Sequence, residues 1–335
     1  MAALPPDVHQ LSLPTPFRIG PVNAWVLRGA PLTLVDPGPL MPETRAALEA
    51  GLVELGLAIE DVELVVLTHQ HHDHIGLAAE VRERSGASVA AIAPLATFLA
   101  DFDAAMDRDD AYAVTLMQHH GVSEQTVTTL DGLSRTFRRF GAGVAVDRVL
   151  ADGDVLDAGG RRFEVALRPG HSPTDTLLYD RDAGLLVGGD HLLPEVSSNP
   201  VAHPPVGDAD PVAAATSPDR PRPLVEYMAS MRATARLPEL QLVLPGHGAA
   251  FQEARPLVEQ RLAMHERRAQ KILGEIDGRT TAADVGRRLW RNVPVTQAYL
   301  VLSEVLAHLG LLVERGQVTE VAEDGVARYV PTRGT

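Results

Sequence analysis

The stretch Thr68-His69-Gln70-His71-His72-Asp73-His74 directly follows an apolar run, residues 63–67, that is typical of a buried strand. His69 and His71 are two residues apart, so their side chains leave an extended loop on the same side. Imidazole and carboxylate groups suit Zn²⁺, with Fe and Mn as the alternatives. The stretch therefore predicts a metal-binding loop where a strand ends and a helix begins.

Three later segments repeat this pattern. In each of them a short apolar run ends, a glycine appears, and a residue able to bind a metal follows. They are His171 after residues 162–167, Asp190 after residues 185–187 and His247 after residues 240–244. Because ligands gather at the carboxyl ends of strands in α/β architectures, we expect these side chains to meet the loop at 68–74 around one centre.

Composition limits the kind of protein and the kind of site. The 335 residues are 45% hydrophobic and 22% charged, which is typical of a globular protein with one large domain and room for a small appendage. Cysteine is absent, which excludes disulfides, thiolate ligands and a cysteine nucleophile. Residues 1–10 show no secretory signal and no apolar run suggests a membrane span, so we expect a cytoplasmic protein without a membrane partner.

Short apolar runs alternate with helical patterns along the first 255 residues, which favours layers of sheet covered by helices. Two stretches interrupt this alternation. Residues 95–147 predict a helical insertion, either with a small core of its own or as a lid over a pocket for a hydrophobic substrate. Residues 194–223 contain eight prolines and predict a long loop.

The character of the chain changes after residue 255. We expect helices at residues 256–273, 281–290 and 296–309, and a hairpin that pairs residues 311–314 with 327–330. This order indicates a winged-helix-like domain over residues 256–335, beside a catalytic domain over residues 1–255. The candidate recognition helix contains no Arg or Lys, so we expect no DNA partner and interpret the module as a packing or homodimerisation element.

As a set, the His-x-His-x-Asp-His motif at residues 69–74 with His171, Asp190 and His247 resembles the metallo-β-lactamase superfamily of hydrolases, over about residues 8–255. Asp36, which precedes a Pro-Gly pair, matches a further feature of that family. The resemblance implies an α+β fold, a four-layer αβ/βα sandwich whose site lies at one edge between the two sheets.

The resemblance also implies a role for each residue of the set. One metal would be held by His69, His71 and His171, and a second by Asp73, His74 and His247. Asp190 would bridge the two ions, and Asp73 would also act in catalysis by orienting a hydroxide and passing on its proton. Asp36 and His191 are candidates for outer partners of the ligands or for substrate contacts. Two Zn²⁺ ions per chain are expected, with Fe or Mn as alternatives.

Such a centre would polarise a carbonyl or phosphoryl oxygen and lower the pKa of a bridging water. We expect hydrolysis of an ester, thioester or related acyl bond in a hydrophobic small molecule. A single-strand endoribonuclease or phosphodiesterase of the same fold is one alternative, although the net charge of −14 argues against RNA. A mononuclear iron enzyme similar to the persulfide dioxygenases is another, and a catalytically silent scaffold is a third.

Overall fold

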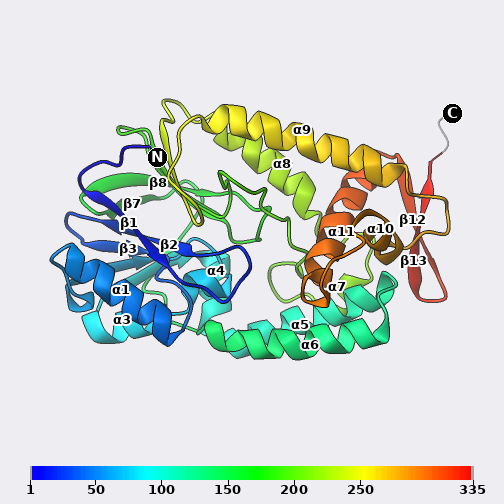
Figure 1. Ribbon diagram of the computed structural model, residues 1–335, viewed down its shortest axis with the longest axis horizontal. Coiled ribbons are helices and arrows are strands. Elements are labelled where there is room, and N and C mark those ends of the chain that lie inside the picture. The colour runs from blue at the N-terminus through cyan, green and yellow to red at the C-terminus, as the bar shows by residue number, and fades with distance from the viewer. Residues whose placement is uncertain (1, 333–335) are drawn as a thin grey trace.

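Two β-sheets pack face to face in the computed structural model, which describes residues 2–332 (Figure 1). The first sheet has the strand order β1-β2-β3-β4-β5-β6, antiparallel from β1 to β3 and parallel from β3 to β6. Its strands are β1 (Val8–Leu13), β2 (Val22–Leu27), β3 (Thr33–Val35), β4 (Leu64–Val66), β5 (Ser88–Ile92) and β6 (Arg148–Leu150).

The second sheet has the strand order β11-β10-β9-β8-β7, in which only β10 and β11 run parallel. Its strands are β7 (Val155–Ala158), β8 (Arg161–Leu167), β9 (Thr176–Asp180), β10 (Leu185–Gly189) and β11 (Leu242–Pro245). β9 and β10 are buried along their whole length. The apolar run at residues 185–187 predicted β10, whereas β9 was not predicted.

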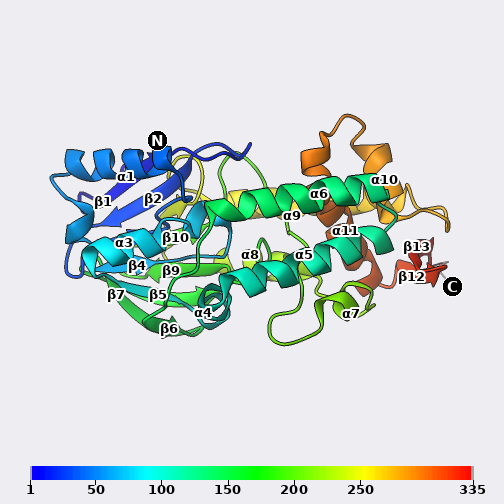
Figure 2. The ribbon, with the colours of Figure 1, turned by 90° about the horizontal axis from the view of Figure 1, so that it is seen from below.

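Helices cover the outer faces of both sheets. α1 (Pro42–Glu54) and α3 (Ala78–Ser85) lie on the first sheet (Figure 2), and α8 (Pro223–Thr234) packs on the second. α1 has a proline in its first turn, where the missing N–H leaves no bond unmade, and α3 ends at Gly86 in the left-handed conformation (φ +74°). The arrangement of helix, sheet, sheet and helix agrees with the layered α/β fold expected from the sequence.

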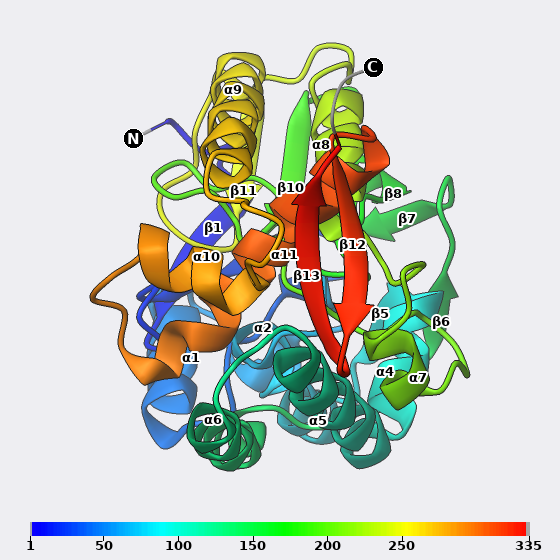
Figure 3. The same cartoon turned by 90° about the vertical axis from the view of Figure 1, so that its right-hand side faces the viewer.

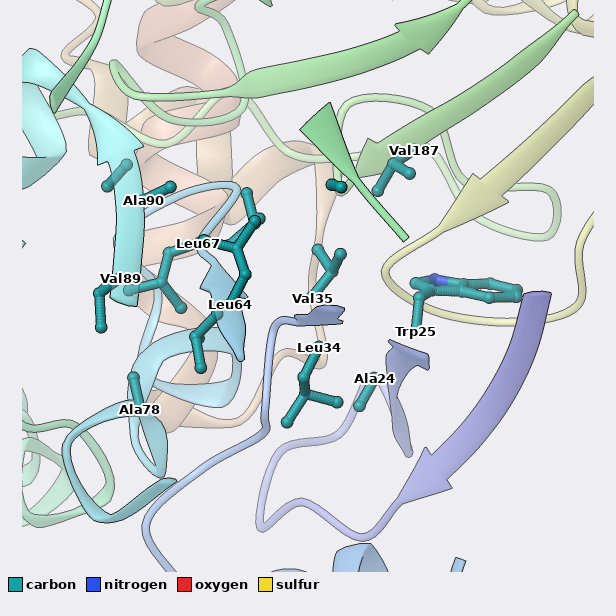
Figure 4. Packing of buried hydrophobic residues seen from close by; sticks show 14 of the residues in the cluster. Ala24, Trp25, Leu34, Val35, Leu64, Leu67, Ala78, Val89, Ala90 and Val187 are labelled. Carbon is teal, nitrogen blue, oxygen red and sulfur yellow. The ribbon is translucent and has the colours of Figure 1, made fainter. Parts of the chain in front are cut away.

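The two sheets are tied together at the edge where β2 starts. Trp25 is buried between them, and Figure 4 shows it in the same core as Val187 of the second sheet. Its indole N–H donates to the Pro245 carbonyl over 3.1 Å, and the Asn23 amide donates to the same carbonyl over 2.9 Å. The Asn23 backbone N–H also donates to the Gly246 carbonyl over 2.7 Å. These bonds fix the loop after β11 against the first sheet.

The rest of the chain extends from one end of the sandwich (Figure 1). Two α-helices of the insertion, α5 (Phe102–His119) and α6 (Glu124–Phe137), run side by side there (Figure 2). They lie opposite the long helix α9 (Ala254–Leu273), as Figure 1 shows. The remaining elements are α2 (His72–Ile75), α4 (Ala93–Ala100), α7 (Pro211–Ala215), α10 (Ala282–Leu289), α11 (Ala298–Glu314), β12 (Val318–Glu323), β13 (Val326–Pro331) and the 3₁₀ turns η1 (Ile59–Asp61), η2 (Arg138–Phe140) and η3 (Val295–Gln297).

The insertion does not have a separate core. Tyr112 and Leu116 of α5 belong to the same buried apolar cluster as Leu302 of α11, Val258 of α9 and Tyr227 of α8. One continuous core therefore runs from the outer face of the second sheet, through the insertion, into the C-terminal helices. The domain boundary at residue 255 and the winged-helix interpretation stay predictions.

One expected strand was wrong. Residues 311–314 do not pair with residues 327–330 but form the last turn of α11. Leu311 and Leu312 are buried there and continue the apolar face of the helix, and the chain turns only at Gly316 (φ +67°). The hairpin consists of β12 and β13, which lie at the end of the molecule that faces the viewer in Figure 3.

The segment Val295–Glu314 is long and apolar enough to span a membrane by length and composition alone, with a mean hydropathy of 1.4 in its most apolar window. Its apolar character has another explanation in the fold. α11 has ten buried residues and packs against α8, α9 and α10, so it is the central helix of the C-terminal core.

We expect His265 on α9 to make the protein sensitive to acid. Its side chain is fully buried with Nδ1 3.2 Å from His308 Nε2 on α11, and burial lowers its pKa from 6.5 to about 3. The unfolded chain therefore takes up a proton below pH 6.5 that the folded chain does not, and the free energy of unfolding falls as the pH drops through this window. His265→Gln keeps a donor for His308 but does not titrate.

Urea unfolding at about pH 7.5 and about pH 5 measures this effect. The loss of unfolding free energy on acidification should be smaller in His265→Gln than in the parent protein by about 1 to 2 kcal/mol. Arg267→Gln, at an exposed position of the same helix, is the control and should behave like the parent. Equal acid sensitivity of the parent and His265→Gln would contradict the prediction.

Candidate metal centre

The carboxylate of Asp36 fixes the start of the loop after β4. Asp36 follows β3 with φ +52° and is buried. Its carboxylate accepts the Thr68 backbone N–H over 2.9 Å and the Thr68 hydroxyl over 2.6 Å. The chain therefore leaves β4 in a fixed direction, and α2 begins at His72. The residues between them, His69 to His71, are therefore constrained on both sides.

The first group of potential ligands consists of three imidazoles from two loops. His71 Nδ1 lies 3.2 Å from His69 Nε2 and 2.9 Å from His171 Nε2. His171 reaches this point from the loop after β8, so residues 100 positions apart in the chain meet here. Three ring nitrogens thus converge on one point, as the ligands of a tetrahedral Zn²⁺ would.

The remaining nitrogens of this group show which atoms carry hydrogen. His171 Nδ1 lies 2.9 Å from the Asn199 carbonyl, which can only accept, so Nδ1 is the donor and Nε2 presents a lone pair. Thr68 donates its own hydroxyl proton to Asp36, so it accepts from His69 Nδ1 over 3.0 Å. His69 Nε2 is then also a free acceptor facing the same point.

The second group consists of Asp73, His74 and His247. His247 Nε2 lies 3.4 Å from Asp73 Oδ2, and His247 Nδ1 donates to the Pro21 carbonyl over 2.7 Å. His74 Nδ1 donates to Asp36 Oδ2 over 2.9 Å. In both rings the outer nitrogen is anchored to an acceptor, and Nε2 faces inward.

Asp190 lies between the two groups. Its Oδ1 is 3.5 Å from His74 Nε2, and its Oδ2 is 3.5 Å from His247 Nε2 and 3.7 Å from His171 Nε2. One carboxylate therefore faces imidazoles of both groups, which is the position a bridging ligand needs. The five histidines and two aspartates predicted from the sequence all meet here.

This donor set fits metal ions. His74 Nε2, His247 Nε2 and Asp190 Oδ1 are buried and have no hydrogen-bond partner within residues 2–332. Leaving buried acceptors unsatisfied is costly, and bringing several lone pairs together adds repulsion. Cations placed among them would satisfy every inward lone pair at once, and the all-nitrogen and oxygen set suits Zn²⁺, Fe or Mn.

The electrostatics of the site also favour positive charge. Burial lowers the pKa of His71 to about 3 and that of His69 well below its usual value, so both rings are neutral and able to bind a metal. Burial opposes protonation of His74 too, but the carboxylates of Asp190, Asp36 and Asp73 outweigh it and raise its pKa well above the usual range. The carboxylates around His74 therefore stabilise a positive charge on this side of the centre, whether a proton or a metal ion carries it.

The two candidate outer residues have different surroundings. Asp36 lies behind the ligands, where it contacts Thr68 and His74 rather than the open side of the site. His191 follows Asp190 but its ring turns into the core, with Nε2 2.9 Å from the Thr234 hydroxyl. His72 packs edge-on against Phe102, with ring centroids 6.0 Å apart, and takes no part in either group.

One supporting residue was not predicted. Asp175 is buried and accepts the backbone N–H groups of His171 over 2.9 Å and of Ser172 over 3.0 Å, as well as the Ser172 hydroxyl over 2.8 Å. It therefore closes the turn that presents His171. The signal was available in the sequence, because Ser-Pro-Thr-Asp directly after a potential ligand is typical of a tight turn stabilised by side chains.

Comparison with known proteins agrees with this arrangement. A family model described as the metallo-beta-lactamase superfamily matches residues 18–247. The chain is similar to a probable metallo-hydrolase, YqjP, of Bacillus subtilis (strain 168), at 30% identity over 325 residues, which covers 96% of this chain and 97% of that protein. It is also similar to the acyl-coenzyme A thioesterase MBLAC2 of Homo sapiens, at 30% identity over 175 residues, covering 50% of this chain and 57% of that protein.

Solved structures resemble the whole chain. A metallo-beta-lactamase family protein, TTHA1429, from Thermus thermophilus has a TM-score of 0.80 at 29% identity, covering 98% of this chain and 100% of that one. A beta-lactamase domain protein from Burkholderia ambifaria has a TM-score of 0.82 at 27% identity, covering 98% of this chain and 93% of that one. The similarity therefore includes the C-terminal helices as well as the sandwich.

His71→Ala should bind less metal than His72→Ala. The two imidazoles are adjacent in one loop, but only His71 Nδ1 faces His69 and His171, whereas His72 packs on Phe102. We expect the dissociation constant of the more weakly bound metal ion to rise about tenfold or more in His71→Ala relative to the parent. The metal content of His72→Ala should match that of the parent. Mass spectrometry of metal content after dialysis measures both. Equal content in the two variants would contradict the assignment of His71.

Gly246→Ala should disrupt the centre without unfolding the protein. A Cβ at this position would lie 2.1 Å from Asp190 Oδ1 and 2.8 Å from His74 Cε1, so Asp190 would have to move. We expect lower metal content with an unchanged circular dichroism spectrum. Gly132→Ala, in α6, is the control because an added Cβ there meets nothing within 4 Å. It should raise the free energy of unfolding by about 0.5 to 1 kcal/mol and leave metal content unchanged. Normal metal binding by Gly246→Ala would contradict the geometry.

Proposed function

The chain belongs to the metallo-β-lactamase superfamily and is a metallo-hydrolase, and on this premise we propose that it cleaves an ester, thioester or related acyl bond of a hydrophobic small molecule. The observation that carries the proposal is the convergence of five imidazoles and two carboxylates on one sheet edge. No serine or cysteine nucleophile is needed when such a centre generates hydroxide from water.

We propose that the centre holds two ions, with Zn²⁺ as the first candidate and Fe or Mn as alternatives. His69, His71 and His171 would hold one ion, Asp73, His74 and His247 the other, and Asp190 both. When bound, such ions polarise the substrate oxygen and lower the pKa of a shared water to near neutrality.

Asp73 is the residue that we assign to proton transfer. Burial alone would raise its pKa, but the imidazoles of His74 and His247 lower it to about 2. The carboxylate is therefore ionised at neutral pH and can accept a hydrogen bond from the attacking water, which fixes the direction of attack. A proton taken up by so weak a base is released readily, so the same group can deliver it to the leaving atom.

The acyl substrate class has support from two directions. The thioesterase MBLAC2 is similar to half of this chain. An open groove of about 810 Å³ has apolar lining residues that include Leu40, Leu99, Phe102 and Val144, together with charged residues, which are Asp101, Asp103, Arg138 and Arg139. It shares Phe102 and Gly141 with the packing around His72, so a hydrophobic group bound there would be close to the loop that carries the ligands.

Nucleic acid is less well supported as a substrate. The net charge of −14 repels a polyanion. The helix that would read DNA in a winged-helix protein, α11, contains no Arg or Lys and has ten buried residues. To bind in the major groove of DNA, α11 would have to leave the core in which it is buried.

An activity panel on protein with measured metal content tests the proposal. We expect kcat/KM for a long-chain acyl thioester to exceed that for a lactone, a phosphodiester and single-stranded RNA by about tenfold or more. Asp73→Asn should lower kcat by about 100-fold or more. Asp157→Asn is the control, because this carboxylate is exposed on β7 and is not among the residues that line the groove. Cleavage of RNA alone, or one iron per chain with oxygen consumption on a persulfide, would contradict the proposal.

A further inference from the structure

We propose that the C-terminal helix α11 holds His171 in position through residues 198–202, which we call the strap, and that Asn199 is the positioning residue. The inference rests on the proposed role of His171 as a metal ligand. The C-terminal region, although far from the motif at residues 69–74 in the sequence, would then contribute to metal binding.

The strap contacts two loops that carry ligands. The Asn199 carbonyl accepts His171 Nδ1–H over 2.9 Å, and the Val201 backbone N–H donates to the His171 carbonyl over 3.3 Å. The Ser198 hydroxyl donates to the backbone carbonyl of Asp190. The strap therefore orients the ring of His171, because the hydrogen bond of Nδ1 is made to Asn199. A shift of the strap would rotate His171 Nε2 away from His71.

The other side of the strap is bound to the first turn of α11. The Asn199 side-chain amide donates to the Leu300 carbonyl over 2.9 Å, and the Tyr299 hydroxyl donates to the Ala202 carbonyl over 2.8 Å. The Leu300 carbonyl can only accept, so it is the amide nitrogen of Asn199 that faces α11. One residue thus joins the metal centre to the helix, with its backbone on His171 and its side chain on Leu300.

The strap and α11 differ in their local structure. Residues 190–210 contain no helix or strand, so the strap lies in the middle of a long irregular loop. α11 is the opposite, because Leu302, Val305 and Leu309 are buried in the apolar cluster that joins the second sheet to the insertion. A loop held to such a helix at two points loses the freedom that would otherwise misplace His171.

This arrangement predicts a selective effect. The strap orients His171 of the first ligand group, whereas His74 and His247 of the second are anchored on Asp36 and Pro21. A change at Asn199 leaves the bond between Ser198 and Asp190 in place, so weakening the bond between Asn199 and α11 should lower the affinity for one ion and spare the other. A general loss of structure would lower both.

The test compares Asn199→Ala and Tyr299→Phe with the parent protein by titration of the metal-free chain with Co²⁺, followed through visible absorption. Asn199→Ala keeps the backbone carbonyl that His171 uses, so any effect must pass through the position of the strap. Ser197→Ala is the matched control, since its hydroxyl lies in the same loop and has no hydrogen-bond partner within residues 2–332.

We expect Asn199→Ala and Tyr299→Phe each to weaken one of the two Co²⁺ binding steps by about tenfold, with the other step and the circular dichroism spectrum unchanged. Ser197→Ala should match the parent. Unchanged affinities in both folded variants, or equal weakening of both steps, would overturn the inference. A parent protein that binds no Co²⁺ would instead refute the proposed function, so the two failures are distinguishable.

Discussion

The mutual repulsion of inward-facing lone pairs and carboxylates is the constraint on which this structure depends. Imidazole nitrogens lie as close as 2.9 Å at the sheet edge, and Asp190 contributes a buried oxygen without a partner within residues 2–332. Left alone, these groups would separate or turn toward other donors. They stay because four of the five rings, those of His69, His74, His171 and His247, are bonded through their outer nitrogen, and because the space that the ligands enclose favours a cation.

The anchors behind the rings come from distant parts of the fold. Asp36 at the end of β3 holds His74 and, through Thr68, His69. The Pro21 carbonyl, just before β2, holds His247. Both anchors belong to the first sheet, and the bonds of Trp25 and Asn23 to the loop after β11 fix the second sheet against it at this edge. The packing of the two sheets thus sets the directions in which the imidazole nitrogens point.

The C-terminal helices share a buried core with the second sheet. The buried cluster that begins on the second sheet passes through α8 and the insertion to α11, with Tyr227, Tyr112 and Leu302 among its members. Because this core does not end at the sandwich, the loop around Asn199 has a fixed support on its outer side. The position of His171 is therefore determined by packing on both sides of the chain that carries it.

The sequence by itself determined which side chains meet at the sheet edge, because glycine turns after short apolar runs placed His171, Asp190 and His247 at strand ends. It also determined the alternation of strands and helices in the sandwich. It did not determine the start of the hairpin, because Leu311 and Leu312 suit a strand or a buried helix equally until α9 and α8 are packed against them. Only the tertiary structure decided which nitrogen of each ring faces inward and that Asp36 supports the loop while His191 turns away. The physical reason is that hydrogen bonds to Asn199 and Pro21 join residues far apart in the chain, and local sequence patterns carry no information on such contacts.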